Sequence, residues 1–448
     1  MKNKQYFTGA LFILCAILAN FSAFSQTPPK GYEIVFKTHN TNEKYLYLIG
    51  IYGNEPYVVD SAKYTKNGYV FKNNKQILPS GFYTIESQNR INRIIHAEFI
   101  VDKTRTFVMD EMRDKLVFTH SEENELFKSF QSALEAGNEL HIFYQTAPES
   151  LLAKFVLAQY IPVSIPEFFW GSHAGREVAA QKYYQALIDH FFDNVDFKDI
   201  RLMYMPLNID LKEFFVESLY PQTAENVISS IENFFNRILD PKPTPEQFEV
   251  RDFYLKKLIH LYLTAEPKFD KVFIYLVDNY VAKLTQSRFI SGSEADVFKR
   301  IAERKRKTLV GETIPVFESY TLAHHKISTA DTKKAYTLLW FWDPDCEHCI
   351  ENTPQLYDFY CKYHDLYNFE VIACSVTEDY DRWVAFIHKN HLEWFNTSYA
   401  ISEPNYDAVE FFNFADTPAI FIIDKQHKIV ARQFPLDELF EVFESLQN

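Results

Sequence analysis

Residues 340–349 read WFWDPDCEHC, so that two cysteines separated by two residues directly follow an apolar stretch. The apolar run Tyr336–Trp342 predicts a buried strand, and the segment that begins at Cys346 predicts a helix. Near the C-terminus, Thr417-Pro418 precedes a second apolar run. A Cys-x-x-Cys between a strand and a helix, with a Thr-Pro before a later strand, indicates redox chemistry.

The composition is that of a multidomain globular protein. Its 448 residues suffice for two or three domains, and the 47% that are hydrophobic suffice for packed cores. Gly is scarce at 11 residues, and neither a Walker loop nor a G-x-G-x-x-G motif occurs, which argues against a glycine-rich nucleotide site. The formal charge of −14 argues against nucleic acid as a partner.

The N-terminus, residues 1–25, has the pattern of a secretory signal. Two lysines in the first four residues precede an apolar core over residues 7–19, and Ala23-Phe24-Ser25 fits a small-x-small cleavage site. A lipid anchor on Cys15 is the alternative, disfavoured because this cysteine lies inside the apolar core. No later segment is long and apolar enough to span a bilayer. We therefore expect an exported protein, in the periplasm or cell envelope.

Hydrophobic periodicity predicts two domains before the cysteines. Over residues 30–120, short runs rich in β-branched and aromatic residues predict at least seven strands and a β-sandwich, with a hairpin turn at Asn67-Gly68. Over residues 121–309 the period becomes helical, which predicts an all-α domain. Its basic run Lys299–Lys307 is interpreted as a solvated helix end, favoured by the helix dipole.

Strands and helices alternate over residues 310–448, which predicts a layered α/β domain. The predicted elements are a strand over 336–342, a helix from 346, a strand over 369–376, a helix over 379–390, a short strand near 398–401, a helix near 408–414, strands over 419–423 and 429–434, and a final helix over 436–446.

Together these features resemble the thioredoxin superfamily, and within it the exported TlpA/ResA-like thiol-disulfide oxidoreductases. The order of a signal, a β domain, a helical domain and a C-terminal thioredoxin fold also resembles a multidomain subgroup of Bacteroidetes-type bacteria. The resemblance implies a thioredoxin-like α/β fold for residues 310–448. The features that carry it are Phe341-Trp342, Cys346-x-x-Cys349, Pro354, the inserted strand and helix over Phe369–Asn390, and Thr417-Pro418.

The two cysteines predict the chemistry. A helix N-terminus at Cys346 would favour its thiolate, which would attack a substrate disulfide before Cys349 resolves the mixed disulfide. This chemistry needs no metal and no cofactor beyond the Cys346–Cys349 disulfide. By resemblance, Pro418 is cis and lies beside the cysteines, and Trp342, Thr417 and Pro418 shape the groove for a disulfide-bearing protein. A membrane thiol shuttle as electron donor is likewise implied by the family.

Two positions depart from the family pattern. Trp340 stands where thioredoxins carry a buried aspartate, and Asn352 stands where ResA-like proteins carry an acid. Glu351, one position away, is therefore the candidate proton acceptor for Cys349.

The charges around the cysteines bear on the direction of electron flow. His348, if protonated, would stabilise the thiolate and make the site more oxidising. Acidic neighbours would oppose the thiolate, and their larger number favours a reductase. These acidic neighbours are Asp343, Asp345, Glu347 and Asp416.

Other functions of the cysteines are possible alternatives to thiol-disulfide exchange. Cys346, Cys349, Cys361 and Cys374 could bind zinc, but the second pair is widely spaced and Cys374 falls in an apolar strand. A peroxidatic site needs a threonine three residues before the reactive cysteine, where Asp343 stands. At the level of function, the alternatives to a reductase are a protein disulfide oxidase or isomerase, or a non-catalytic envelope binding protein with a vestigial cysteine pair.

Overall fold

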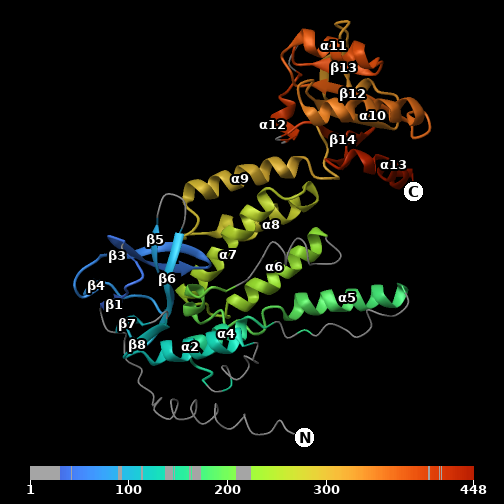
Figure 1. Ribbon diagram of the computed structural model, residues 1–448. Coiled ribbons are helices and arrows are strands. Elements are labelled where there is room, and N and C mark those ends of the chain that lie inside the picture. The colour runs from blue at the N-terminus through green and yellow to red at the C-terminus, as the bar shows by residue number, and fades with distance from the viewer. Residues whose placement is uncertain are drawn as a thin grey trace. The chain divides into compact units, whose positions relative to one another are not determined.

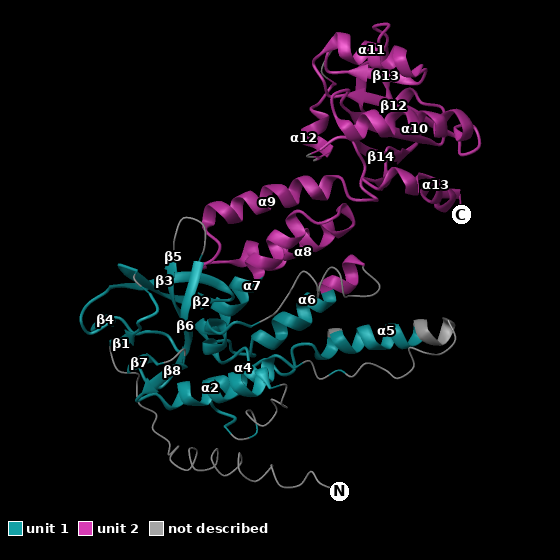
Figure 2. Ribbon diagram, viewed as in Figure 1, with its two compact units in different colours: residues 1–222, 229–254 teal, residues 223–228, 255–448 magenta. Residues whose placement is uncertain are grey.

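The computed structural model describes residues 31–447 apart from 42, 89–92, 113–114, 137–144, 146, 161–162, 164–172, 208–222, 402–403, 413 and 415. The predicted signal segment lies outside the described residues. The chain divides into two compact units, unit 1 of residues 1–222 and 229–254 and unit 2 of residues 223–228 and 255–448 (Figure 2). The helical stretch predicted as one domain is therefore shared between the two units.

Unit 1 contains a β-sandwich, as predicted. Its two four-stranded sheets have the orders β4-β1-β7-β8 and β3-β2-β5-β6. Ile34 and Phe36 of the first sheet and Leu46 and Leu48 of the second are fully buried in one shared core, because alternate residues of each strand face inward. The strands are β1 (Tyr32–Lys37), β2 (Tyr45–Tyr52), β3 (Glu55–Lys63), β4 (Tyr69–Asn73), β5 (Gly81–Gln88), β6 (Arg93–Val101), β7 (Thr106–Met112) and β8 (Lys115–Thr119) (Figure 1).

The predicted turn at Asn67-Gly68 exists and closes an antiparallel bridge between Thr65 and Gly68, but the strands on either side of it do not pair with each other. Thr65 and Gly68 exchange two backbone hydrogen bonds of 3.1 and 2.9 Å, and Gly68 has a φ of +88°. However, β3 pairs with β2 and β4 pairs with β1, so the turn carries the chain from one sheet to the other. Turn residues determine a local bend, whereas the burial of each strand's apolar face selects its partner.

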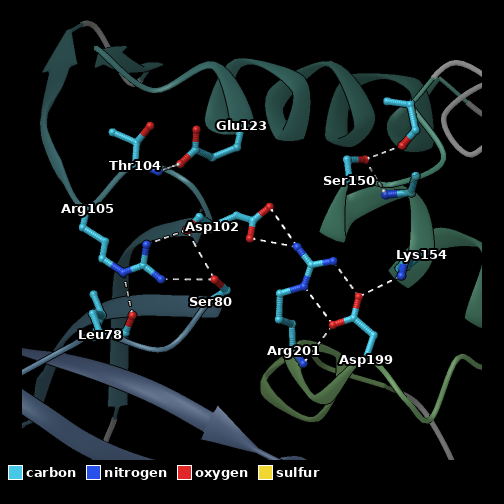
Figure 3. Close-up of polar contacts among 12 residues, drawn as sticks. Leu78, Ser80, Asp102, Thr104, Arg105, Glu123, Ser150, Lys154, Asp199 and Arg201 are labelled. Atoms are coloured by element: carbon cyan, nitrogen blue, oxygen red, sulfur yellow. Dashed lines mark hydrogen bonds and ion pairs between the residues drawn. The ribbon is translucent and has the colours of Figure 1, made fainter. Parts of the chain in front are cut away.

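Ion pairs join the β-sandwich of unit 1 to helices of the same unit (Figure 3). Arg201 lies 3.1 Å from Asp102, which follows β6, and 2.5 Å from Asp199. Lys154 of α4 also contacts Asp199, at 3.0 Å. The described α-helices with residues in unit 1 are α2 (Glu122–Glu135), α4 (Leu151–Ala158), α5 (His173–His190), α6 (Ala224–Ile238) and α7 (Pro245–Leu263), of which α6 and α7 also have residues in unit 2.

Unit 2 is built on a five-stranded sheet in the order β13-β12-β11-β14-β15. Strand β12 pairs in parallel with both β11 and β13. Strand β14 pairs antiparallel with both β11 and β15. Four of the five strands follow the predicted ranges closely, whereas the short strand predicted near 398–401 lies three residues earlier, and the α/β fold class is confirmed. The five strands are β11 (Tyr336–Trp342), β12 (Phe369–Ser375), β13 (Phe395–Ser398), β14 (Ala419–Asp424) and β15 (Ile429–Arg432), with a small hairpin of β9 (Glu318–Tyr320) and β10 (Lys326–Ser328).

Helices cover both faces of this sheet. Alternate residues of β11 enter two different cores: Trp340 packs with α10, α11 and α13, whereas Phe341 packs with α12. Among the described helices, none combines the length and the apolar character needed to cross a bilayer. The helices of unit 2 are α8 (Asp270–Asn279), α9 (Gly292–Lys307), α10 (Glu347–Tyr363), α11 (Tyr380–Asn390), α12 (Ala408–Phe412) and α13 (Leu439–Gln447) (Figure 1).

A buried group of charges ties α8 and α9 to the sheet. Asp270 of α8 forms ion pairs with both Lys305 of α9 and Arg432 of β15. Arg432 also donates to the Thr308 hydroxyl at 2.8 Å and to the Pro267 carbonyl at 3.1 Å. The interpretation of Lys299–Lys307 as a solvated helix end is therefore wrong for Lys305, which is buried because it pairs with Asp270.

Candidate active site

The turn between β11 and α10 holds the first cysteine at a helix N-terminus. The Asp343 carboxylate accepts the Asp345 N–H at 2.8 Å, which tightens the turn after Trp342. Cys346 is the N-cap of α10, and its Sγ accepts the Cys349 N–H at 3.4 Å. The free N–H groups and the positive dipole end of the helix thus meet at the Cys346 sulfur.

The two thiols have different environments. Cys346 is partly exposed, whereas Cys349, one turn further along the helix, is fully buried. Burial opposes ionisation of Cys346, but hydrogen bonds from Cys349, Thr417 and the His348 N–H outweigh it and lower the pKa of Cys346. Burial raises the pKa of Cys349 to about 12. Cys346 is therefore the thiol better suited to act as a nucleophile, whereas Cys349 stays protonated near neutral pH.

The segment before β14 completes the site. The Cys346 thiol donates to the Thr417 carbonyl, with 3.0 Å between Sγ and the oxygen. The Thr417–Pro418 peptide bond is cis, as the resemblance implied, and both residues are partly exposed. A segment far from the cysteines in sequence thus contacts the Cys346 sulfur.

Trp342 does not line the groove, contrary to the prediction. Its side chain is fully buried and lies against the Phe386 ring of α11, with 4.8 Å between centroids. Helices cover both faces of the sheet, so Trp342 is buried in the same core as Trp340, two residues earlier on β11. Trp342 supports the reactive turn from within.

Trp340, in place of the family's aspartate, is also buried. Its Nε1 donates to the Thr353 hydroxyl on α10 at 3.1 Å, and Thr353 is fully buried. Indole and hydroxyl therefore satisfy each other inside the core, one helical turn beyond Cys349.

The polar residues of the cysteine stretch point outward. Glu347, His348 and Glu351 are all exposed, so they flank the buried Cys349 thiol and do not enclose it. Cys349 accepts the Asp343 N–H at 3.5 Å, and the described residues provide no hydrogen bond between Cys349 and Glu351. The structure thus gives no support to Glu351 as the proton acceptor.

One charged residue at the site was missed by the sequence reasoning. Arg382 of α11 contacts Asp345, the residue immediately before Cys346. A signal existed, because a cation in the first turn of a helix faces the positive end of the dipole and needs a nearby acid. The sequence does not show which acid that is.

The other two cysteines lie apart from the site. Cys374 faces the core on the α12 side of the sheet, whereas Cys349 faces the opposite core, and Cys361 is exposed on α10. In the part of the chain that the structure describes, no group of three or more His, Cys, Asp or Glu side chains is placed to hold a metal ion. A zinc site shared by all four cysteines does not fit this arrangement.

The difference between the thiols gives a pH-dependent prediction. With the reduced protein, iodoacetamide should label Cys346 at a rate that rises with pH and reaches half of its maximum below 9.0, the ordinary thiol pKa, because the pKa of Cys346 is lowered. Cys349 should stay unlabelled up to about pH 11, since its pKa is raised to about 12 and its sulfur is buried. Mass spectrometry of the peptide with both cysteines measures this, and faster labelling of Cys349 would contradict it.

Two of the similar solved structures each cover about a third of this chain. Among curated proteins none matches the chain. A thioredoxin domain of a thiol-disulfide oxidoreductase from Bacteroides vulgatus is 24% identical, with 31% of this chain and 99% of that chain covered and a TM-score of 0.28. A thiol:disulfide interchange protein from a Bacteroides species is also 24% identical, over 31% of this chain and 90% of that one, with a TM-score of 0.28.

A longer match is weaker in identity. A thioredoxin-like protein from Bacteroides caccae is 16% identical, with 64% of this chain and 98% of that chain covered and a TM-score of 0.42. Residues 334–429 match the family described as Thioredoxin-like. This range contains β11, the two cysteines and the cis Thr417–Pro418 bond. The C-terminal part of the chain is therefore a thioredoxin-like domain.

Proposed function

We propose that this protein is an exported thiol-disulfide oxidoreductase that reduces disulfides of other proteins. The observation that carries the proposal is the pairing of two different thiols beside the partly exposed Thr417. Cys346 is partly exposed and has a lowered pKa at a helix N-terminus, whereas Cys349 is buried and has a raised pKa. A buried structural cysteine pair needs none of these features.

The reaction would proceed through a mixed disulfide. The Cys346 thiolate attacks one sulfur of the substrate disulfide, that S–S bond breaks, and the other substrate sulfur leaves as a thiolate and takes up a proton. Cys349 then loses its proton and attacks Cys346 Sγ, which releases the second substrate thiol and leaves a Cys346–Cys349 disulfide. Two electrons pass to the substrate, and a thiol donor, such as a membrane thiol shuttle, must return them.

One observation favours a second candidate, an oxidase or isomerase of protein disulfides. A lowered pKa of Cys346 stabilises the reduced form of the pair, which raises its reduction potential. The exposed carboxylates of Glu347 and Asp416 act in the opposite direction. We favour the reductase because these acids outnumber the single histidine, His348.

The reduction potential tests both the function and its direction. The protein would be equilibrated in thiol redox buffers, and the Cys346–Cys349 pair followed by the mass of the alkylated peptide. A value near or below about −220 mV is expected for a reductase, whereas a value near about −120 mV would establish the oxidase. A pair that never exchanges with the buffer would overturn the proposed function. The Cys361→Ser variant is the matched control, because this exposed cysteine lies outside the site.

A further inference from the structure

An arginine from outside the cysteine stretch lies at the reactive turn. Arg382, the third residue of α11, donates from Nη1 to Asp345 Oδ2 at 2.5 Å, and Asp345 immediately precedes Cys346. Its Nε lies 3.2 Å from Asp379 Oδ2. The guanidinium is therefore held between one carboxylate on the reactive turn and another at the start of α11.

The location of Arg382 requires these partners. A cation in the first turn of a helix is disfavoured by the positive end of the dipole, so the helix by itself gives no reason for an arginine here. Asp379 compensates in part, and it also accepts the Arg382 N–H at 3.1 Å. The hydrogen bond that Arg382 donates to Asp345 is the largest of the causes that raise the pKa of Arg382. The strongest contact of the arginine is thus directed at the turn before Cys346.

We propose that Arg382 is a positioning residue that sets the reactivity of Cys346 by neutralising Asp345, an inference that rests on the oxidoreductase function proposed above. An unpaired Asp345 would place a negative charge one residue from the thiol and disfavour the thiolate. With the ion pair formed, the net charge of the two side chains is zero. Other charged side chains of the cysteine stretch, of the start of α11 and of the segment before Pro418 remain unchanged in the test. They are Asp343, Glu347, His348, Asp379, Asp381 and Asp416.

The test compares two opposite charge changes and their combination in the full-length, reduced protein. At pH 7 and low salt, Arg382→Gln should slow the alkylation of Cys346 by about twofold to threefold, because Asp345 is left unpaired. Asp345→Asn should accelerate it by a similar factor, because the arginine charge is now uncompensated. The double variant should return to the wild-type rate, and about 0.5 M NaCl should reduce all differences. Mass spectrometry of the Cys346 peptide measures each rate.

Lys334→Gln is the matched control. It also removes one positive charge from an exposed ion pair, with Asp365 at 2.6 Å, but it precedes β11 and so lies at the other end of that strand from Cys346. The proposal is overturned if this control changes the rate as much as Arg382→Gln, if the two single variants shift it in the same direction, or if neither shifts it. If Arg382→Gln does not fold, Asp345→Asn alone tests the proposal: faster alkylation of Cys346 supports it, and an unchanged or slower rate overturns it. The assay uses no disulfide, so its outcome is separate from that of the reduction-potential test.

Discussion

Replacement of Asp270 by asparagine is expected to lower the free energy of unfolding of unit 2 by about 3–5 kcal/mol. The asparagine would leave Lys305 and Arg432 buried without their shared counter-charge, and an uncompensated buried charge costs more than the lost attraction. Urea unfolding followed by tryptophan fluorescence measures the change. The signal reports mainly on this unit, because four of the five tryptophans, at positions 340, 342, 383 and 394, are buried in its thioredoxin-like part.

Asp278→Asn provides the comparison for this prediction. Asp278 lies on the same helix and pairs with Arg306 at 3.0 Å, but both side chains are substantially exposed, so a loss of about 1 kcal/mol or less is expected. Equal effects of the two asparagine variants would contradict the burial argument. Replacing all three buried charges by apolar residues of similar size should recover most of the loss.

Replacement of Cys346 by serine is expected to lower the rate of disulfide reduction by about three orders of magnitude or more, because the serine hydroxyl stays protonated and cannot open the substrate disulfide.

Replacement of Cys349 by serine should permit formation of the mixed disulfide on Cys346 but prevent its resolution. With glutathione disulfide as the probe, this variant should accumulate a glutathione adduct on Cys346, which the intact mass detects. Cys361→Ser, on the exposed side of the same helix, should behave as the wild type.

The outcome of the two site variants separates catalyst from binding protein. Undiminished reduction by the Cys346→Ser variant would contradict the assignment of the nucleophile. Rapid release of glutathione by Cys349→Ser would show that a different group resolves the mixed disulfide. Cys374→Ser is a further control, because it replaces a cysteine that is buried on the other face of the sheet and lies outside the site.

The sequence predicts best those elements whose signals are local. The run Tyr336–Trp342 coincides with β11, and the predicted helix at Cys346 is α10. These succeed because periodicity and capping depend on neighbours in the chain. The Asn67-Gly68 hairpin fails because the partner of a strand depends on which faces are buried together, and no local pattern encodes that.

The site shows the same division. The spacing of the two cysteines and the family resemblance predict Cys346, Cys349 and Pro418 as site residues. The burial of Trp342 and the contact of Arg382 with Asp345 depend on how α11 packs against the turn, which the sequence does not show. Lys305 was expected in solvent because five other cations surround it in the run Lys299–Lys307. Its acid, Asp270, lies 35 residues away, which is beyond the reach of a helical charge pattern.

The partners of Arg432 determine which residues the thioredoxin-like domain needs when it is expressed alone. The arginine belongs to the domain's own edge strand, yet the groups that satisfy it, Asp270, Thr308 and the Pro267 carbonyl, precede residue 310. A fragment that begins at residue 310 would keep the guanidinium and lose every one of these partners. In this chain the domain is fitted to its preceding helices, so a transplantable module begins before Pro267.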